Sequence, residues 1–502
     1  MRTARRALGN SAWLASADVA TQIMGFASAI LMARLLGSQV MGQYAFCFAL
    51  TGVVNPVVDL GLGTVTVRAL ARDASRIPYY FSNVLSFKVI QGVLGYGAIL
   101  IVSLFLHKER VVIQAVRVAG AAILINAVIE TCFSIFSGRE ELRQVALLGL
   151  LGNFARQVTT LWLIFARQGL LALVLATLAC RALTLLVTVC VFRSRFGRVG
   201  FRPDIRSWPS LIKESWAFGA TAVFSKWWDS VPVVVLGWLS SDSQVGYFAA
   251  ARKLIDVGRV ISRAYSPAVF PVLSRLAIHQ SKNRFDEAVR LILRALMAVG
   301  VLACVLAVVG APDAIRLAYG AKFVACVPVL RLLGAHLGVA FLTGFIGTVA
   351  YATNREVLCL RVNAGLLALE FGLDLWLVPA FGAVGAAVAR LGCETLAVVV
   401  YGIFLRVALR PASVALPAVL TVVSGALLGA MWWGAAMVPV LVKAALAVPL
   451  FAGLLFGVRA VRCSDLERVR VLFRPRADAI PPGQVLDRGT NGLSVGQSSP
   501  AD

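Results

Sequence analysis

The chain has 502 residues, of which 59% are hydrophobic and only 14% are charged, and its mean hydropathy is +0.84. This composition excludes a water-soluble domain and is typical of a protein with many membrane spans. The formal net charge of +24 does not indicate nucleic-acid binding, because the basic residues lie in short segments between apolar runs rather than in one soluble domain.

Apolar runs of membrane-spanning length recur along the chain and predict an all-α integral membrane protein with about 14 transmembrane helices. The first run follows a basic N-terminus and is interpreted as a retained span, because no clear signal-peptide cleavage site follows it. The runs lie near residues 12–33, 40–63, 83–106, 117–137, 145–166, 170–192, 214–239, 245–274, 291–311, 324–351, 357–379, 382–405, 412–433 and 437–458.

The segments between these runs alternate in their content of basic residues. About 29 Lys and Arg residues fall on one set of segments, which includes both termini, and about seven fall on the other set. By the positive-inside rule, we expect a multi-pass membrane protein whose two termini are both cytoplasmic.

A short motif occurs twice, about 204 residues apart, and predicts a six-span unit that is used twice. Residues 38–45 (SQVMGQYA) open the second span, and residues 243–249 (SQVGYFA) open the eighth. We therefore expect an N-terminal lobe at 1–192, a basic cytoplasmic linker at 193–213, a C-terminal lobe at 214–406, two further spans at 407–458 suited to a lipid tail, and a cytoplasmic, largely disordered tail at 459–502.

The eighth run is unusual because it carries an ionic stripe. At 100° per residue, Arg252, Asp256, Arg259 and Arg263 fall on one helical face, with Lys253 beside them. An ion at the centre of a membrane helix costs about 2.5–3.5 kcal/mol, so this face must line water or meet counter-charges. We expect a solvated cationic path, although a helix on the membrane surface or a structural ion-pair network would give the same stripe.

Other spans also contain ionisable residues, which are functional candidates because their burial is costly. The candidates for substrate binding share a positive charge and are Arg156, Arg181, Lys226, Arg252, Lys253, Arg259, Arg263 and Arg331. The candidates for ion coupling are the acids Asp18, Glu130, Asp229 and Asp256.

Two of these candidates also have a structural interpretation. Lys226 and Asp229 are spaced for an i, i+3 ion pair within one helix, which is the interpretation we favour. The functional alternative is that Trp227 and Trp228 stack on sugar rings while Lys226 meets an anion.

A second group of charges lies near the end of the predicted C-terminal lobe. Arg390 and Glu394 are four residues apart and are expected to neutralise each other. Glu370 and Asp374 lie near the outer end of their span, where we expect water to reach them.

Nothing in the sequence indicates a catalytic residue, a metal site or a cofactor. The phosphate-binding motif GxxxxGK[ST] does not occur, the nine cysteines form no CxxC pair, and the three histidines lack ligand spacing. We therefore expect a transporter and not an enzyme.

Four short segments resemble the polysaccharide-unit flippases of the multidrug/oligosaccharidyl-lipid/polysaccharide (MOP) exporter superfamily. They are residues 59–63 (DLGLG), 246–254 (GYFAAARKL), 270–274 (FPVLS) and 381–386 (FGAVGA). The resemblance implies two six-helix lobes plus two extra helices, which translocate an undecaprenyl-diphosphate-linked oligosaccharide by alternating access. It also implies a role in exopolysaccharide, capsule or O-antigen (lipopolysaccharide) synthesis in the bacterial inner membrane. The implied partners are the lipid-linked oligosaccharide, membrane lipids, a glycan polymerase and a chain-length regulator, with the protein itself a monomer.

Several other functions remain as alternatives. Lipid II flippases and multidrug or cation antiporters share the implied architecture, but a cation exporter needs an acidic cavity, whereas the central excess of charge here is basic. A membrane glycan polymerase or ligase would need a larger outer loop than the dozen or so residues expected. A structural scaffold would not need a stripe of buried charge.

Overall fold

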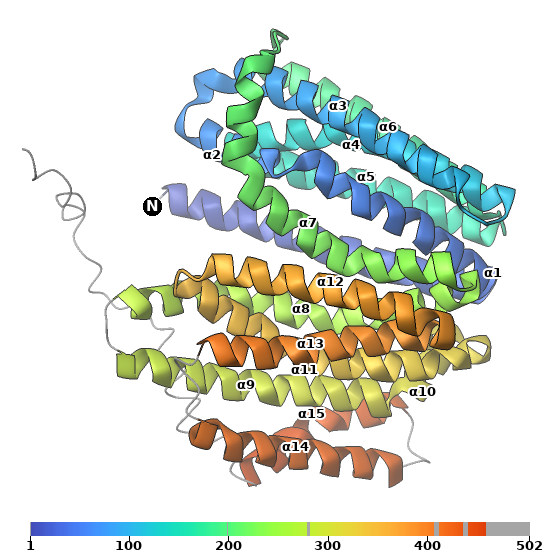
Figure 1. Ribbon diagram of the computed structural model, residues 1–502, viewed down its shortest axis with the longest axis vertical. Helices are drawn as coiled ribbons and strands as arrows, with labels where there is room; N and C mark the ends of the chain where they lie inside the picture. The colour runs from blue at the N-terminus through green and yellow to red at the C-terminus, as the bar shows by residue number, and fades with distance from the viewer. Residues whose placement is uncertain (1, 198, 279–281, 406–410, 435–439, 458–502) are drawn as a thin grey trace, which may run out of the picture.

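The computed structural model describes residues 2–197, 199–278, 282–405, 411–434 and 440–457, so the predicted tail at 459–502 lies outside the described residues. Within these ranges the protein is all-helical, and each of the fourteen apolar runs overlaps a helix (Figure 1). The helices are α1 (Arg2–Asp59), α2 (Leu62–Arg72), α3 (Ile77–Leu104), α4 (Arg110–Gly138), α5 (Leu142–Phe165), α6 (Leu170–Phe196), α7 (Trp208–Leu239), α8 (Asp242–Ile278), α9 (Lys282–Val309), α10 (Ala311–Tyr319), α11 (Val327–Ala352), α12 (Glu356–Phe381), α13 (Ala383–Leu405), α14 (Pro411–Gly434) and α15 (Val440–Gly457).

Eight helices in the described ranges are long and apolar enough to cross a membrane. This confirms the prediction of an all-α, multi-pass membrane protein, whereas the number of fourteen spans stays a prediction. Two short helices, α2 and α10, were not predicted, because each lies in a segment that is too short and too polar to span a bilayer.

The first two predicted spans are joined without a loop. α1 continues through both and breaks only at Gly37, whose φ of 85° and ψ of −179° are accessible without strain only to glycine. Near this break, Arg34 donates from Nε to the carbonyl oxygen of Ala318 at 2.7 Å and from Nη2 to that of Leu317. These carbonyls end α10 and lack intrahelical partners, so the guanidinium ties the break in α1 to the second half of the chain.

The helices pack as two groups with α1, α7 and α8 between them (Figure 1). In the first group α4 contacts α3 and α6, and α5 contacts α6 and α1. In the second group α11 contacts α8, α9 and α13, and α12 contacts α13 and α7. α14 and α15 pack against each other and against α9 through a small cluster that includes Trp432 and Phe451.

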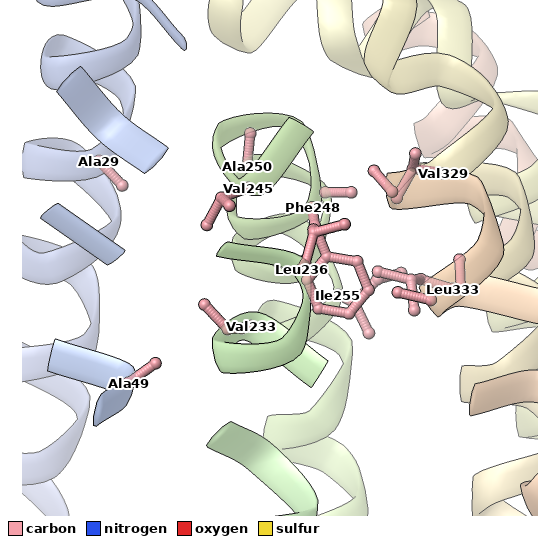
Figure 2. Close-up of a cluster of buried hydrophobic side chains, with 14 of the residues drawn as sticks. Ala29, Ala49, Val233, Leu236, Val245, Phe248, Ala250, Ile255, Val329 and Leu333 are labelled. Carbon is pink, nitrogen blue, oxygen red and sulfur yellow. The ribbon is translucent and has the colours of Figure 1, made fainter. Parts of the chain in front are cut away.

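Small and branched apolar side chains fix α8 between its neighbours (Figure 2). Phe248 of α8 and Leu236 of α7 are fully buried and lie toward Val329 and Leu333 of α11. Ala49 of α1 lies on the opposite side of α8. Burying a Phe or Leu side chain contributes about 1.5–3 kcal/mol each. The rotation of α8 about its axis is therefore set by its apolar residues, and this rotation decides where its charges point.

The two copies of the repeated motif lie against each other, backbone to backbone. A Cβ atom on Gly42 of α1 would collide with the carbonyl oxygen of Asp242, and a Cβ on Gly246 of α8 would collide with the facing α1 backbone. Beside this glycine contact, Asp242 accepts a hydrogen bond from Gln43 Nε2 at 2.9 Å and pairs with Lys108 Nζ at 2.6 Å. The contact therefore joins α1, α8 and the segment between α3 and α4 at the end of the bundle where α1 is broken.

The predicted linker at 193–213 is shorter in the structure, because α6 extends into its start and α7 begins at Trp208. The remaining residues are bonded to α3. The Ser82 hydroxyl donates to the Gly200 carbonyl at 3.1 Å, and Asn83 Oδ1 accepts the Asp204 backbone N–H at 2.7 Å. The linker is thus attached to the first group of helices before the chain enters α7.

Candidate functional site

A cavity of about 1320 Å³ lies between the first group of helices and the pair α7 and α8. α1, α2, α4, α5 and α6 form one wall, and α7 and α8 form the other. Its charged lining consists of the cations Arg156, Arg181, Lys226 and Lys253 and the acids Asp59, Glu130 and Asp256. Its neutral polar lining includes Gln22, Ser28, Tyr44, Asn55, Asn126 and Gln157.

Three of the cations gather from three different helices. Arg156 of α5 is close enough to Arg181 of α6 and to Lys253 of α8 to repel both electrostatically. In the part of the chain that the structure describes, none of the three has a carboxylate within 4.0 Å, and Arg156 only approaches Asn153 Oδ1 at 3.4 Å. Glu130 attracts Arg181 and Asp256 attracts Lys253, but neither acid forms an ion pair with them within 4.0 Å. Cations held together in this way create a positive potential that attracts a multiply charged anion.

The acids on the opposite part of the same wall are largely satisfied by the protein. Asp59 pairs with Nζ of Lys88 at 2.5 Å, and its other oxygen accepts the Gly61 N–H at 3.2 Å. Glu130 accepts a hydrogen bond from Asn55 Nδ2 at 3.2 Å. Lys88 is completely buried and pairs with Asp59, so Glu130 is the acid of this wall without a lysine or arginine within 4.0 Å among the described residues.

Replacing Lys88 by methionine is expected to destabilise the protein. The change leaves Asp59 beside the cavity without its counter-charge, and breaking one side of a buried ion pair costs about 3–5 kcal/mol. Thermal unfolding of the purified protein in detergent measures the effect. The double variant Lys88→Met with Asp59→Asn should recover most of the loss, and an equal loss in both variants would contradict the pairing.

The ionic stripe of α8 faces the cavity only in part, because Asp256 lines it whereas Arg252 and Arg259 do not. The residues that α8 contributes to the lining are Ala249, Lys253, Asp256, Val257 and Val260. At about 100° per residue this face is centred roughly 90° away from Arg252. Arg252 and Arg259 lie beside the face of α8 that lines the cavity, and their side chains reach Asp229 of α7. The apolar residues of α8 that pack on α1 and α11 fix this rotation of the helix.

Arg252 and Arg259 share one carboxylate on α7. Asp229 Oδ1 lies 2.8 Å from Nη2 of Arg252 and 3.3 Å from Nη1 of Arg259, and Arg252 also donates to the Asp229 carbonyl. Arg259 lies 3.6 Å from Oδ1 of Asp256. We call these four residues the α7–α8 ion cluster. The prediction of a Lys226–Asp229 pair is therefore wrong, because two guanidinium groups from the next helix outcompete a lysine on the same helix.

Two further polar pairs, on α11, α12 and α13, also join different helices. Arg390 Nε of α13 lies 2.9 Å from Glu370 Oε1 of α12, and His336 Nε2 of α11 lies 3.3 Å from Glu394. The predicted Arg390–Glu394 neutralisation is therefore wrong. Glu370 and Asp374 are completely buried, so the expectation that water reaches them is also wrong.

The cavity thus brings together Arg156, Arg181, Lys226 and Lys253 with Glu130 and Asp256. Arg331 lies on an exposed face of α11 and outside the lining. The side chains of Asp18 and Arg263 lie outside the described part of the structure. Sequence reasoning missed the amides Asn55, Asn126 and Gln157, although polar amides inside apolar runs were a usable signal.

The sequence profile described as "Polysaccharide biosynthesis protein" matches residues 7–277, which is more than half of the chain. The chain belongs to this family. This confirms the resemblance drawn from the sequence motifs. The "Probable low-salt glycan biosynthesis flippase Agl15" of Haloferax volcanii is 23% identical over 375 residues, which cover 72% of this chain and 76% of that protein.

Solved structures of the MOP superfamily share the fold. The lipid II flippase MurJ in an inward closed conformation matches with a TM-score of 0.73 and 14% identity, over 92% of this chain and 99% of MurJ. An inward-facing multidrug resistance MATE transporter matches with a TM-score of 0.63 and 16% identity, over 77% of this chain and 94% of that protein. Like these proteins, the polysaccharide biosynthesis family member described here has a transporter fold.

Proposed function

We propose that the protein is a flippase that moves an undecaprenyl-diphosphate-linked oligosaccharide from the cytoplasmic to the outer leaflet, for exopolysaccharide, capsule or O-antigen synthesis. The observation that carries this proposal is the group formed by Arg156, Arg181 and Lys253 in the cavity. These cations come from both walls, and among the described residues none of them makes an ion pair within 4.0 Å, which leaves them available to a diphosphate.

Each part of this substrate has a matching environment. The diphosphate binds Arg156, Arg181 and Lys253, because charge-assisted hydrogen bonds to phosphate are strong and the guanidinium fork matches its oxygens. Lys226 adds a fourth cation from α7. The sugars meet the neutral amides of Asn55 and other lining residues, and the prenyl tail stays in the bilayer, where the spans at 407–458 suit it.

The two groups of helices serve as the two lobes of alternating access, with α1–α6 in one lobe, α7–α13 in the other and α14 and α15 added at the side. The positive-inside rule places both termini in the cytoplasm and the glycine contact at the outer end. Moving an anion outward from a negative interior is favoured by about 2.3 kcal/mol per charge per 100 mV. The membrane potential can therefore contribute to the driving force.

A multidrug or cation antiporter fits the cavity less well. A cationic drug would have to approach four cations, while Asp59 and Asp256 are already engaged by Lys88 and Arg259. Lipid II also carries a diphosphate, so the cations of the cavity suit either lipid. Lipid II and the proposed oligosaccharide lipid differ in their glycan and not in the charge of their diphosphate, so only the glycan that is transported distinguishes these two functions.

Reconstitution in liposomes tests the function. Vesicles are loaded in both leaflets with a polyprenyl-diphosphate-linked disaccharide that carries a fluorophore, and dithionite is added outside to bleach the outer leaflet. The protein should make nearly all of the fluorophore accessible, whereas protein-free vesicles should retain about half. The length of the glycan should stay unchanged. Retained fluorescence would contradict the flippase, and a longer glycan would indicate a polymerase.

A further inference from the structure

Asp229 forms ion pairs with two guanidinium groups that lie beside the proposed diphosphate site. Its carboxylate meets Arg252 at 2.8 Å and Arg259 at 3.3 Å, and it comes from α7 whereas both arginines come from α8. The ion cluster is therefore also a tie between these two helices.

The ion cluster lies beside the cavity and is not sealed in the core, and its member Asp256 lines the cavity. The side chains of Arg252, Arg259 and Asp229 are 24%, 32% and 30% exposed. Asp256 belongs to both places, because it lines the cavity and also contacts Arg259. Lys253, one of the proposed phosphate ligands, directly follows Arg252 in the chain. An anion bound at Lys253 shares the cavity wall with Asp256, which lies 3.6 Å from Arg259 of the ion cluster.

A diphosphate competes well with a carboxylate for arginine. It carries more charge and more acceptor oxygens, so at the same distance it attracts a guanidinium group more strongly than a single carboxylate does. Arginine also binds phosphate oxygens in the same bidentate geometry that it uses for carboxylates.

We propose that Asp229 is a resident anion, which holds Arg252 and Arg259 while the cavity is empty and is displaced from them by the diphosphate of the incoming lipid. This inference rests on the proposed function. Displacement breaks the tie between α7 and α8, so loading of the cavity loosens α7. Asp229 thus acts as a positioning residue, and the substrate itself changes the contacts that hold the empty state.

The affinity of an Asp229→Asn variant tests this exchange. The amide cannot compete as an anion, so the purified full-length protein should bind undecaprenyl diphosphate in detergent micelles more tightly, by about fivefold or more. Flipping by the same variant should slow, because its empty state is no longer restored. If Asp229 had only a structural role, Asp229→Asn would lower both the affinity for undecaprenyl diphosphate and the rate of flipping. Asp229→Glu should retain the wild-type affinity and rate.

Further variants separate the exchange from the diphosphate site itself. Adding Arg252→Gln and Arg259→Gln to Asp229→Asn should remove the gain in affinity. If Asp229→Asn does not fold, Asp256→Asn removes one of the two acids that hold Arg259 and should give a smaller gain. If Arg156→Gln weakens binding while neither acid variant tightens it, the exchange is wrong. If Arg156→Gln has no effect on binding, the proposed diphosphate site is wrong instead. Arg76→Gln, at an exposed pair with Asp73, is the matched control.

Discussion

Cells that carry Arg156→Glu together with Arg181→Glu should export almost no glycan. Each arginine that loses a charge-assisted hydrogen bond to the diphosphate costs about 1.5–3 kcal/mol, and the two glutamates add repulsion. The loss corresponds to an affinity that is weaker by at least about a hundredfold, because each 1.4 kcal/mol is a factor of ten. The measurement is the amount of surface glycan per cell, with the level of the membrane protein determined by immunoblot.

Arg331→Glu is the matched control for this experiment. It makes one such Arg-to-Glu substitution on an exposed face of α11, outside the cavity lining, and should leave export near the wild-type level. Wild-type export by the double variant at a normal protein level would exclude Arg156 and Arg181 from substrate binding. Equal loss in the control would indicate a general effect of charge on membrane insertion.

Gly246→Val should stop transport without changing a charge or any residue of the cavity lining. The valine side chain has no room against the α1 backbone, so α8 and α1 must separate at the glycine contact. The outer end then cannot close, and the cycle of alternating access is interrupted. We expect loss of flipping in liposomes together with a cavity that stays open to the outside.

The open cavity can be detected directly. Tyr44 lines the cavity two residues after Gly42, so Tyr44→Cys in a background without the nine native cysteines reports access from that end. A membrane-impermeant maleimide added to intact cells should label it strongly in the Gly246→Val variant. Gly97→Val, at a glycine where an added Cβ would have no neighbouring atom within 4 Å, should transport and label like the unchanged parent. Normal flipping by Gly246→Val would show that the contact does not need to close.

The helices were predictable from the sequence because hydropathy is a local property. Fourteen apolar runs all overlap helices, since a chain in a bilayer must satisfy its backbone hydrogen bonds within each segment. The runs at 12–33 and 40–63 predicted a boundary that contains Gly37, but hydropathy could not show that a single glycine, rather than a loop, joins the two spans.

The partners of the charges were less predictable. Spacing within one helix favoured Lys226 with Asp229, yet the structure pairs Asp229 with arginines of α8. Helical periodicity identifies which residues share a face, but the packing of residues such as Phe248 against other helices decides which way that face points. Arg156 and Arg181 were found because no acid lies near them in the sequence, and this property did carry over into three dimensions.

The break at Gly37 has a practical consequence for mapping the topology of this protein. Tags and reporter fusions are usually placed where two spans meet, since most such turns are exposed loops that tolerate insertions. Here the turn is a single glycine, and Arg34 beside it is bonded to the end of α10. A reporter inserted at residue 37 would push α1 and α10 apart and record the position of a damaged protein. Reporters are better placed in the exposed turn at 166–169, between α5 and α6.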